Sequence, residues 1–531
     1  MEIVKTDVLV IGGGGAGMRA ALEAKENGAE VLIVAKTPIG KSTCTYLSGG
    51  AFSVATEGFS KEDHLQNTLQ AGKGLNNREL VEALVEEVPE RLRELERFGL
   101  VGEWRKARFN CLGKPPAWGA PFTQVLAETV GKQGISARPW IMIIDVITEE
   151  EKAVGALGFN FRSGELVAFR TKAIILANGG VGALYGRHDN PVRTTGDGYA
   201  LAFHAGCSLR DMEFVQFMPP GLAEPGKPAT LIAPALCDVG RVINSAGEDV
   251  VEKYHITEKP VAIRSRDSFS LAIFKEEAAG RNVFLDLRNV SEKDWPRDNM
   301  ARTQRDFLVK NCSCYQKTLR ISPMCHFFMG GVAAGQNGET EISGLFAAGE
   351  VVGGAHGANR MGGNALGETL VFGYRAGKTA AQSAREQSWK QADEKLLNDR
   401  LPILQGKLGK SNSGPQPRAL RKKIGETLWK DGGILRDGIG LRRALESLRL
   451  IREETLQGMR AETGKEILEK MEVENGLLVG EMIIRSALLR EESRGAHFRK
   501  DFPKADDSKW KGNIFLKKSG EGMRLEFRPL L

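Results

Sequence analysis

The chain has no long apolar segment. Nowhere do about 18 uncharged apolar residues follow one another, which is the length that a membrane-spanning helix requires. The N-terminus also lacks the basic region, apolar core and cleavage site of a signal peptide. We therefore expect a cytoplasmic protein.

Cysteine is scarce as well. The seven cysteines among 531 residues are odd in number and scattered, which favours reduced thiols over a disulfide framework. Cys312 and Cys314 form one close pair, whereas an iron–sulfur cluster needs four thiolates. We expect no metal centre in this chain, so any such cluster must lie in a partner protein.

Strong charge is also absent. The net charge of +7 is modest for this length, and no basic stretch is interleaved with aromatic residues as in nucleic-acid-binding chains. We therefore expect no nucleic-acid partner. The apolar residues, 41% of the chain, can fill several hydrophobic cores, and the length predicts about two to four domains.

What the sequence does contain is a glycine-rich turn near its start. An apolar strand beginning at Asp7 leads into Gly12-x-Gly14-x-x-Gly17 and an alanine-rich helix, and a second apolar strand follows at 31–34. Glycines in this context permit a tight turn and bring a pyrophosphate close to the helix N-terminus. The pattern predicts a dinucleotide cradle at Gly12, Gly14, Gly15, Ala16 and Gly17.

The second strand ends in Val34-Ala35-Lys36-Thr37, without the acidic residue that binds a ribose hydroxyl of NAD. A plain NAD site is therefore not expected. Two further stretches are distinctive: 344–350, which ends in Glu350, and 356–366, which contains Arg360. With these motifs, nearly the whole chain resembles the flavoprotein subunits of succinate dehydrogenase and fumarate reductase, a family that includes L-aspartate oxidase.

The resemblance implies FAD as the cofactor. In relatives the counterpart of Glu350 holds the ribose, and that of Asp197 lies on the adenosine side. The segment matching 364–366 places backbone amides on the flavin ring, where donors stabilise the negative charge of reduction. Besides the cradle, the residues expected at FAD are Lys36, Ser42, Thr43, Gly49, Gly50, Asn178, Gly179, Asp197, Glu350, Asn364, Ala365 and Leu366.

One departure concerns how the flavin is attached. Membrane-bound members carry it on a histidine in a Ser-His-Thr segment that precedes two glycines, and Thr43 stands at that position here. An alcohol is a poor substitute for imidazole in this attachment. The resemblance therefore implies noncovalent FAD, as in aspartate oxidases and soluble fumarate reductases.

The resemblance also assigns a substrate pocket. His326 and Arg360 match the residues that grip a substrate carboxylate, which suits the fork of a guanidinium. Arg266 matches the arginine that passes a proton to or from the substrate carbon. We expect these three residues to be catalytic.

Other pocket residues of the family are missing. Met218 replaces a carboxylate-binding histidine and Pro220 a hydroxyl donor, while the stretch 233–238 lacks the glutamate and arginine that relay protons. Arg264 or Asp238 could substitute in the relay. A thioether suits an apolar surface, so fumarate and succinate are not expected as natural substrates. The substrate would carry one carboxylate or acyl group and a less polar far end near Met218.

The strand and helix signals, with the resemblance, predict an α/β fold. A Rossmann-like FAD-binding domain would comprise residues 1–225 and 323–405, with an inserted α+β capping domain at 226–322. A C-terminal helical domain and tail would occupy 406–531. The charged stretch 492–503 within it fits either internal ion pairs or a role near a partner interface.

Three functions remain open. The favoured one is a catalytic flavoprotein subunit that adds or removes two hydrogens across a carbon–carbon bond of a small carboxylate or acyl substrate. The second is an electron-transfer flavin subunit with a vestigial pocket, and the third is a stand-alone oxidase that resembles aspartate oxidase. Family members usually dock an iron–sulfur electron-transfer subunit, so we expect such a partner and contact with the membrane only indirectly, through partner subunits.

Overall fold

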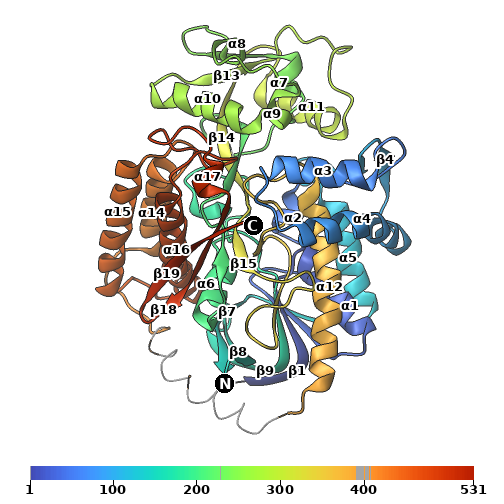
Figure 1. Ribbon diagram of the computed structural model, residues 1–531, viewed down its shortest axis with the longest axis vertical. Helices are drawn as coiled ribbons and strands as arrows, with labels where there is room; N and C mark the ends of the chain where they lie inside the picture. Colours follow the sequence, from blue (N-terminus) through green and yellow to red (C-terminus); the bar gives the residue numbers. More distant parts are fainter. Residues whose placement is uncertain (1, 228, 390–399, 401–405, 407, 531) are drawn as a thin grey trace.

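The computed structural model describes residues 2–530 except 228, 390–399, 401–405 and 407 (Figure 1). The expected domain boundary between residues 405 and 406 lies outside the described part. The chain folds as a mixed α/β protein, with a body built on a mainly parallel sheet, a cap above it and a group of helices along one side (Figure 1). Where the chain is described, every helix is too short or too polar to span a bilayer.

The central sheet of the body has the strand order β6-β2-β1-β9-β8-β7, with β16 also paired to β9. Its parallel part is formed by β6 (Ser136–Pro139), β2 (Val31–Ala35), β1 (Glu2–Ile11), β9 (Glu165–Leu176) and β16 (Leu345–Ala347). The centre of this part is almost wholly apolar because helices cover the sheet. An antiparallel hairpin, β7 (Ile141–Glu149) and β8 (Lys152–Asn160), completes it.

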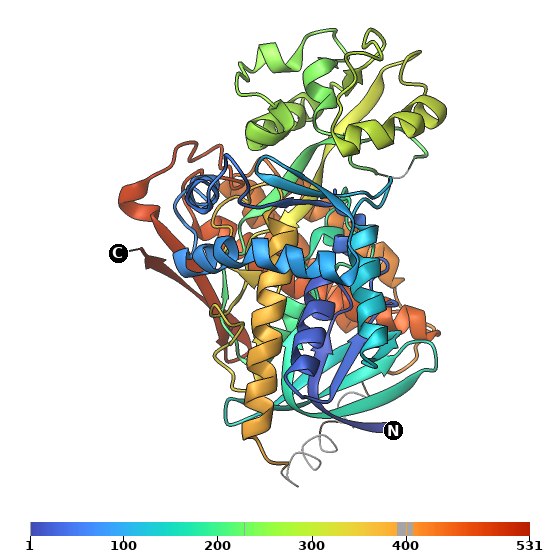
Figure 2. The same cartoon turned by 90° about the vertical axis from the view of Figure 1, so that its right-hand side faces the viewer.

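Two long-range partners, α1 (Gly15–Glu26) and α12 (Asn364–Glu386), lie side by side on one face of this sheet (Figure 2). A Cβ at Gly373 or Gly377 would collide with backbone oxygens of Ala16 or Ala20. These glycines therefore set how closely the two helices approach. On the same side of the molecule lie α3 (Lys61–Ala71), α4 (Arg78–Phe98), α5 (Ala120–Lys132) and a small sheet of β3 (Ala51–Ser53), β5 (Arg108–Cys111) and β4 (Gly102–Arg105) (Figure 1).

The cap contains a four-stranded antiparallel sheet in the order β11-β14-β13-β12, with its own apolar core. Its strands are β11 (Val215–Leu222), β14 (Leu319–Phe328), β13 (Val283–Asp286) and β12 (Arg241–Asn244), and its main helices are α9 (Val261–Arg264), α10 (Arg266–Ala278) and α11 (Asn299–Cys312). The first two strands run between the body and the cap (Figure 1). Two hydrogen bonds fasten α11 to the body: Asn299 Nδ2 donates to Cys111 O at 3.1 Å and Trp118 Nε1 to Thr303 Oγ1 at 2.7 Å.

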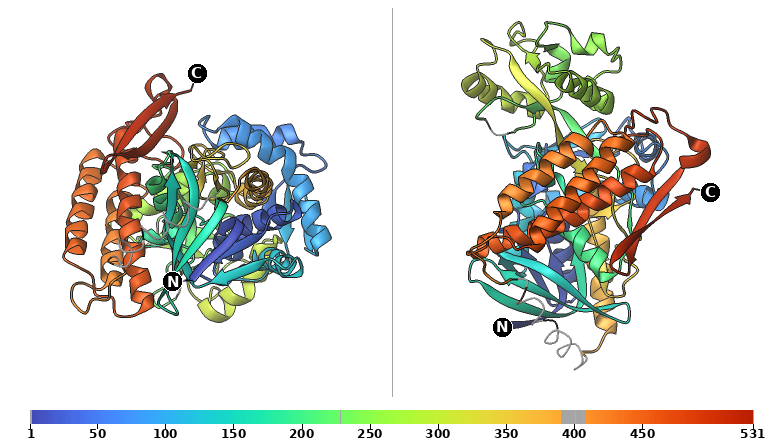
Figure 3. Two further views of the ribbon diagram at one scale, coloured as in Figure 1. Left: turned by 90° about the horizontal axis from the view of Figure 1, so that it is seen from below. Right: turned by 90° about the vertical axis from the view of Figure 1, so that its left-hand side faces the viewer.

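Three helices of the C-terminal part, α14 (Pro417–Asp431), α15 (Gly438–Leu456) and α16 (Gly464–Leu489), pack against one another (Figure 3). The prediction of helices here missed a hairpin of β18 (Gly512–Ser519) and β19 (Gly522–Pro529). It extends a second body sheet with β10 (Leu209–Arg210), β15 (Gly331–Ala333) and β17 (Val352–Gly353), so the tail is integrated into the body. The short helices are α2 (Cys44–Leu47), η1 (Gly182–Leu184), α6 (Asp197–Ala205), α7 (Leu236–Val239), α8 (Val250–Lys253) and α17 (Asp507–Trp510).

Candidate functional site

A cavity of about 480 Å³ extends from the glycine-rich turn to the underside of the cap. The three predicted catalytic residues line it, as do most residues predicted to bind the cofactor. The predicted cofactor residues along it are Gly12, Gly14, Gly15, Ala16, Lys36, Ser42, Thr43, Gly49, Gly50, Asn178, Gly179, Asp197, Glu350, Ala365 and Leu366. Gly17 and Asn364 lie behind this surface, and each supports the lining in a different way.

The glycine-rich turn leaves room for a ligand at the N-terminus of α1. Gly12 has φ +124°, and a Cβ at this position would collide with the carbonyl of Ala177. A Cβ at Gly17 would collide with Gly12 O, so Gly17 is needed to close the turn rather than to touch a ligand. In contrast, the nearest atom to a Cβ at Gly14 would be Thr45 Oγ1, 3.7 Å away, so the space beside Gly14 is open. The buried Oδ1 of Asn178, which also lines the cavity, has no hydrogen-bond partner among the described residues. This arrangement fits the pyrophosphate of FAD.

A charged cluster holds the adenosine end together. Lys36 Nζ lies 2.5 Å from Asp197 Oδ2 and 2.9 Å from Glu472 Oε1, and Asn475 Nδ2 donates to Asp197 Oδ1 at 3.0 Å. Burial disfavours the charged amine, but the two carboxylates raise the pKa of Lys36 above its ordinary value. The sequence argument missed Glu472 and Asn475, because they come from α16, more than 400 residues from Lys36.

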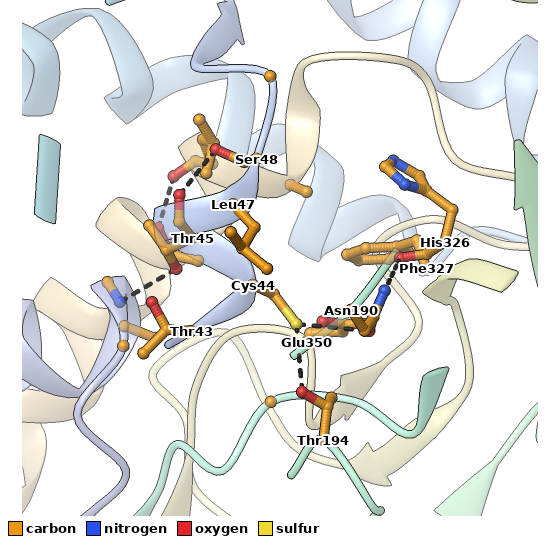
Figure 4. A pocket seen from close by; sticks show the side chains of 18 of the residues that line it. Thr43, Cys44, Thr45, Leu47, Ser48, Asn190, Thr194, His326, Phe327 and Glu350 are labelled. Atoms are coloured by element: carbon orange, nitrogen blue, oxygen red, sulfur yellow. Dashed lines mark hydrogen bonds between the residues drawn. The ribbon is translucent and has the colours of Figure 1, made fainter. Parts of the chain in front are cut away.

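The segment that carries Thr43 forms the short helix α2 at the cavity wall (Figure 4). Thr43 Oγ1 accepts a hydrogen bond from Tyr46 N at 3.1 Å and so caps this helix. The neighbouring Cys44 Sγ lies 3.4 Å from Asn190 Oδ1, and burial raises the pKa of this thiol well above its ordinary value. Thr43 therefore has a structural role in capping, and Cys44 is protonated at neutral pH.

Glu350 lines the same cavity (Figure 4). Burial raises the pKa of Glu350 to about 8, even though Phe328 N donates to its Oε1 at 3.1 Å. A Cβ at Gly180 would collide with this carboxyl group, which explains the glycine there. A buried carboxyl group of this kind can accept or share a hydrogen bond with a ribose hydroxyl.

Asn364 begins α12, whose N-terminus faces the cavity through Ala365 and Leu366. Its side chain is held from behind: Oδ1 lies 2.8 Å from His64 Nε2, and Nδ2 donates to Thr68 Oγ1 at 2.9 Å. Burial lowers the pKa of His64, so the ring is neutral and donates to the amide oxygen. The free amides of a helix N-terminus stabilise negative charge, which suits the electron-poor edge of a flavin.

Arg360 is held by partners that leave its charge uncompensated. Its Nη2 donates to Gln216 Oε1 at 2.9 Å, and its guanidinium carbon lies 4.5 Å from the centroid of the Phe327 ring. Within the described chain no carboxylate lies within ion-pair distance, and Nε has no partner. Burial and the neighbouring Arg266 lower the pKa of Arg360 to about 9. Such a group is prepared to bind a carboxylate.

His326 projects from β14 into the cavity beside Phe327 (Figure 4). Its Nδ1 lies 2.7 Å from Asp189 Oδ2. Burial opposes ionisation of Asp189, but the histidine nearby keeps the pKa of this carboxyl below its ordinary value. The carboxylate therefore fixes the tautomer, and Nε2 is the ring nitrogen left for a ligand.

Arg266 is the first residue of α10 and reaches the cavity from the cap. Its Nη1 donates to Arg360 O at 3.2 Å, and its buried Nε has no partner among the residues described. Burial lowers the pKa of Arg266, and the position at a helix N-terminus disfavours the cation further. Both effects ease the release of a proton by a group that is otherwise always charged.

The wall beneath the cap is apolar, with Met218, Leu231, Pro234, Ala235 and Ile263 along it. Pro220 is buried but does not line the cavity, so its predicted effect on the substrate is not direct.

Neither candidate for a substitute relay reaches the cavity. Arg264 is exposed, and Asp238 Oδ1 accepts from Val261 N at the start of α9. Sequence reasoning also missed Asp189 and Gln216, which orient His326 and Arg360; only their polarity beside apolar strands could have marked them.

Comparisons with known proteins agree with this geometry. A family model described as an FAD binding domain matches residues 7–366, and one described as the fumarate reductase flavoprotein C-terminus matches residues 421–531. One subunit of the fumarate reductase (CoM/CoB) from Methanothermobacter marburgensis is 34% identical over 554 residues, which cover 98% of both chains. Chloroplastic L-aspartate oxidase of Arabidopsis thaliana is 30% identical over 564 residues, covering 97% of this chain and 84% of the other.

Among solved structures, a mutant FrdA of E. coli quinol fumarate reductase matches with a TM-score of 0.89 and 27% identity, covering 100% of this chain and 97% of that chain. The predicted fold class, family and cofactor are thereby confirmed. The chain belongs to the succinate dehydrogenase and fumarate reductase flavoprotein family and is an FAD-dependent oxidoreductase.

Proposed function

We propose that the protein is a catalytic flavoprotein subunit that adds or removes two hydrogens across a carbon–carbon bond next to a carboxylate or acyl group. One observation carries this proposal: Arg266, His326 and Arg360, which are far apart in the sequence, line one cavity together with the glycine-rich cradle. A vestigial pocket would not be expected to keep Arg360 buried and unpaired, because an uncompensated buried charge is costly.

FAD bound along the cradle supplies the two-electron chemistry. The chain's own residues then have separate roles. Arg360 and His326 Nε2 hold the carboxylate, and Asp189 and Gln216 fix their orientation. Arg266 gives a proton to, or takes one from, the substrate carbon. The cap, fastened through Asn299 and Thr303, excludes water from the reacting atoms.

We further propose that FAD is held without a covalent bond and that a partner with iron–sulfur clusters exchanges electrons with it. The first point is supported by Thr43, whose hydroxyl caps α2. The second is supported by the free thiols: all seven cysteines are unpaired, and the described residues contain no cluster of metal-ligating side chains. Acid precipitation should release all the flavin; fluorescence that stays on the denatured chain would contradict noncovalent binding.

The reaction can be tested with the purified holoprotein. Reduced benzyl viologen would supply electrons for the reduction of a panel of 2-enoates. An oxidised dye would accept electrons from the saturated counterparts, with oxygen tested as a separate acceptor. Turnover of one carboxylate class, abolished in Arg266→Gln, is the expected result. Electron exchange with dyes but no carboxylate turnover would instead support the electron-transfer subunit, and full turnover on oxygen would support the oxidase.

A further inference from the structure

Three more arginines line the cavity, and the proposed mechanism uses none of them. Arg105 pairs with Glu103 at 2.8 Å, and Arg193 pairs with Glu472 at 3.5 Å. Arg108 differs: it begins β5 in the β4–β5 hairpin of the body, and its half-buried side chain lines the cavity together with Arg266 and Arg360. Among the residues that the structure describes, none forms a hydrogen bond or an ion pair with its guanidinium.

The charges around Arg108 do not neutralise it. Burial lowers the pKa of Arg108, and the nearest opposing influence, the carboxylate of Asp298, only partly offsets this. Asp298 is already engaged, because its Oδ1 accepts from Ala301 N at 3.0 Å and caps α11. Arg108 also shares the cavity with Arg266, and its charge helps to lower the pKa of Arg266.

Three guanidiniums thus converge on one cavity with no carboxylate in ion-pair contact within the described chain. Arg266 lies beside Arg360, because its Nη1 donates to Arg360 O at 3.2 Å, and Arg108 lines the same cavity. Repulsion between like charges in one cavity is unfavourable unless an anion joins the group. Arg360 with His326 accounts for one carboxylate, and Arg266 serves the reacting carbon, which leaves Arg108 without an anion.

The apolar wall beneath the cap shows why a further contact is needed. The strand position that carries Met218 offers only a thioether, and the neighbouring Leu231, Ala235 and Ile263 are apolar. A second polar group of the substrate would find no partner there. The β4–β5 hairpin offers one, and the guanidinium of Arg108 can form two parallel hydrogen bonds to a carboxylate.

We propose that Arg108 binds a second carboxylate of the substrate and so selects dianionic over monoanionic 2-enoates. The inference rests on the proposed function. It places the two carboxylates at Arg360 and Arg108, with Arg266 at the carbon between them and the apolar wall along the remaining face. The contact replaces, from the body side, the polar contacts that Met218 no longer provides.

Binding can be measured apart from turnover, through the change in the visible spectrum of the bound flavin on titration. The probes would be crotonate as the monoanion, and fumarate and trans-glutaconate as dianions of increasing length. Arg108→Gln removes the charge, Arg108→Lys keeps it without the fork, and Lys106→Gln removes the same charge from the exposed tip of the hairpin, outside the cavity. Thermal stability of each variant with FAD bound shows that it is folded.

We expect Arg108→Gln to weaken binding of at least one dianion by about 10- to 100-fold and to leave crotonate within about twofold, because one charge-assisted pair is removed. Arg108→Lys should weaken dianion binding less, and Lys106→Gln should bind dianions as tightly as the wild type. Equal affinity of the wild type for monoanions and dianions, or equal losses for both in Arg108→Gln, would overturn the proposal. A lower kcat for both classes at unchanged Kd would also overturn it, since Arg108 would then assist Arg266 instead.

The proposed function can fail independently of the assignment of Arg108. Selective loss of dianion binding in Arg108→Gln without turnover of any enoate by the wild type would uphold the assignment of Arg108 and refute the enoate reaction. Turnover of an enoate that is unchanged in Arg108→Gln would uphold the enoate reaction and refute the assignment of Arg108. If no carboxylate perturbs the flavin or raises the melting temperature, both proposals are wrong.

Discussion

Two groups of buried or half-buried arginines in this molecule differ in how their charges are neutralised. The first, which we call the C-terminal network, comprises Arg436, Arg490, Arg494 and Arg499. Arg490 lies 2.6 Å from Glu213 and 2.9 Å from Glu492, and both its side chain and those of its partners are fully buried. Arg494 also pairs with Glu492, at 2.8 Å, and Arg499 pairs with Asp501 at 2.7 Å.

The fourth member of the network is paired through neutral groups. Arg436 Nη1 donates to His497 Nδ1 at 2.7 Å and to Glu213 O at 2.7 Å. Burial and the surrounding arginines keep the pKa of His497 well below its ordinary value, so the ring is neutral and can accept this bond. The second group consists of the cavity arginines Arg108, Arg266 and Arg360, and within the described chain no carboxylate lies in ion-pair contact with them. Arg266 and Arg360 donate only to neutral oxygens.

This difference indicates that the C-terminal network stabilises the fold, whereas the cavity arginines bind a ligand. In the C-terminal network the protein itself supplies the acceptors, and the network joins the segment after α16 to the residue Glu213, just before the strand β11 that leads to the cap. This supports the interpretation of the stretch 492–503 as internal ion pairs. Around the cavity the described residues supply neutral acceptors but no paired carboxylate, so a ligand has to supply the negative charge. Mutations should therefore affect stability in one group and chemistry in the other.

The largest expected effect is on turnover in Arg266→Gln. Loss of a general acid or base typically lowers kcat by about 10²- to 10⁴-fold, with a smaller change in binding. Because Arg266 is an unpaired cation among cations, the melting temperature should stay equal or rise. Steady-state kinetics and calorimetry on the same sample would test both parts. Normal turnover in this variant would remove the catalytic assignment.

A large effect on stability is expected in the C-terminal network. Arg490→Gln leaves the buried carboxylate of Glu213 without its cation and leaves Glu492 with Arg494 alone. Breaking a buried pair in this way typically costs about 3–5 kcal/mol. The exposed pair of Arg528 with Glu526, with half of each side chain accessible, provides the control. Arg528→Gln should change stability by less than about 0.5 kcal/mol. Equal urea midpoints for the two variants would refute the distinction between the groups.

The sequence predicted the part of the site that depends on close contacts between backbone atoms. Gly12 and Gly17 are required by close backbone contacts, so their spacing alone predicts the turn. The resemblance named Arg266, His326 and Arg360 because each lies inside a longer motif, and all three line one cavity. Their catalytic role stays a prediction.

The partners of these residues could not be predicted in the same way. Asp189, Gln216 and Glu472 act through contacts made only after distant elements pack together, and no local pattern marks them. The same limit applies to Arg108, because its proposed role depends on the lack of a paired carboxylate, which only the folded structure shows. The C-terminal hairpin was missed because β19 alternates exposed and half-buried residues, a weak signal in a polar stretch.

The pH dependence offers a third test. Arg360 binds a carboxylate only while protonated, and its pKa is lowered to about 9. The charged form predominates below this value and is lost as the pH rises through it, so kcat/KM should fall about tenfold per unit above pH 9. A bound carboxylate stabilises the cation, so the fall in kcat should occur at higher pH. A flat kcat/KM up to about pH 10, one unit beyond this pKa, in enzyme that remains folded would contradict the assignment.

The smallest expected effect concerns the apolar wall. Met218 is buried at the cavity surface with no polar group to offer, so Met218→His would add one donor to the apolar wall. We expect kcat/KM for fumarate to rise by about tenfold, the value of one ordinary hydrogen bond to a charged group, and kcat/KM for longer, less polar enoates to fall. Met218→Leu keeps the wall apolar and should leave the preference unchanged. If both variants shift the preference equally, the wall acts through its shape and not through its polarity, and the specificity would then depend on the arginines alone.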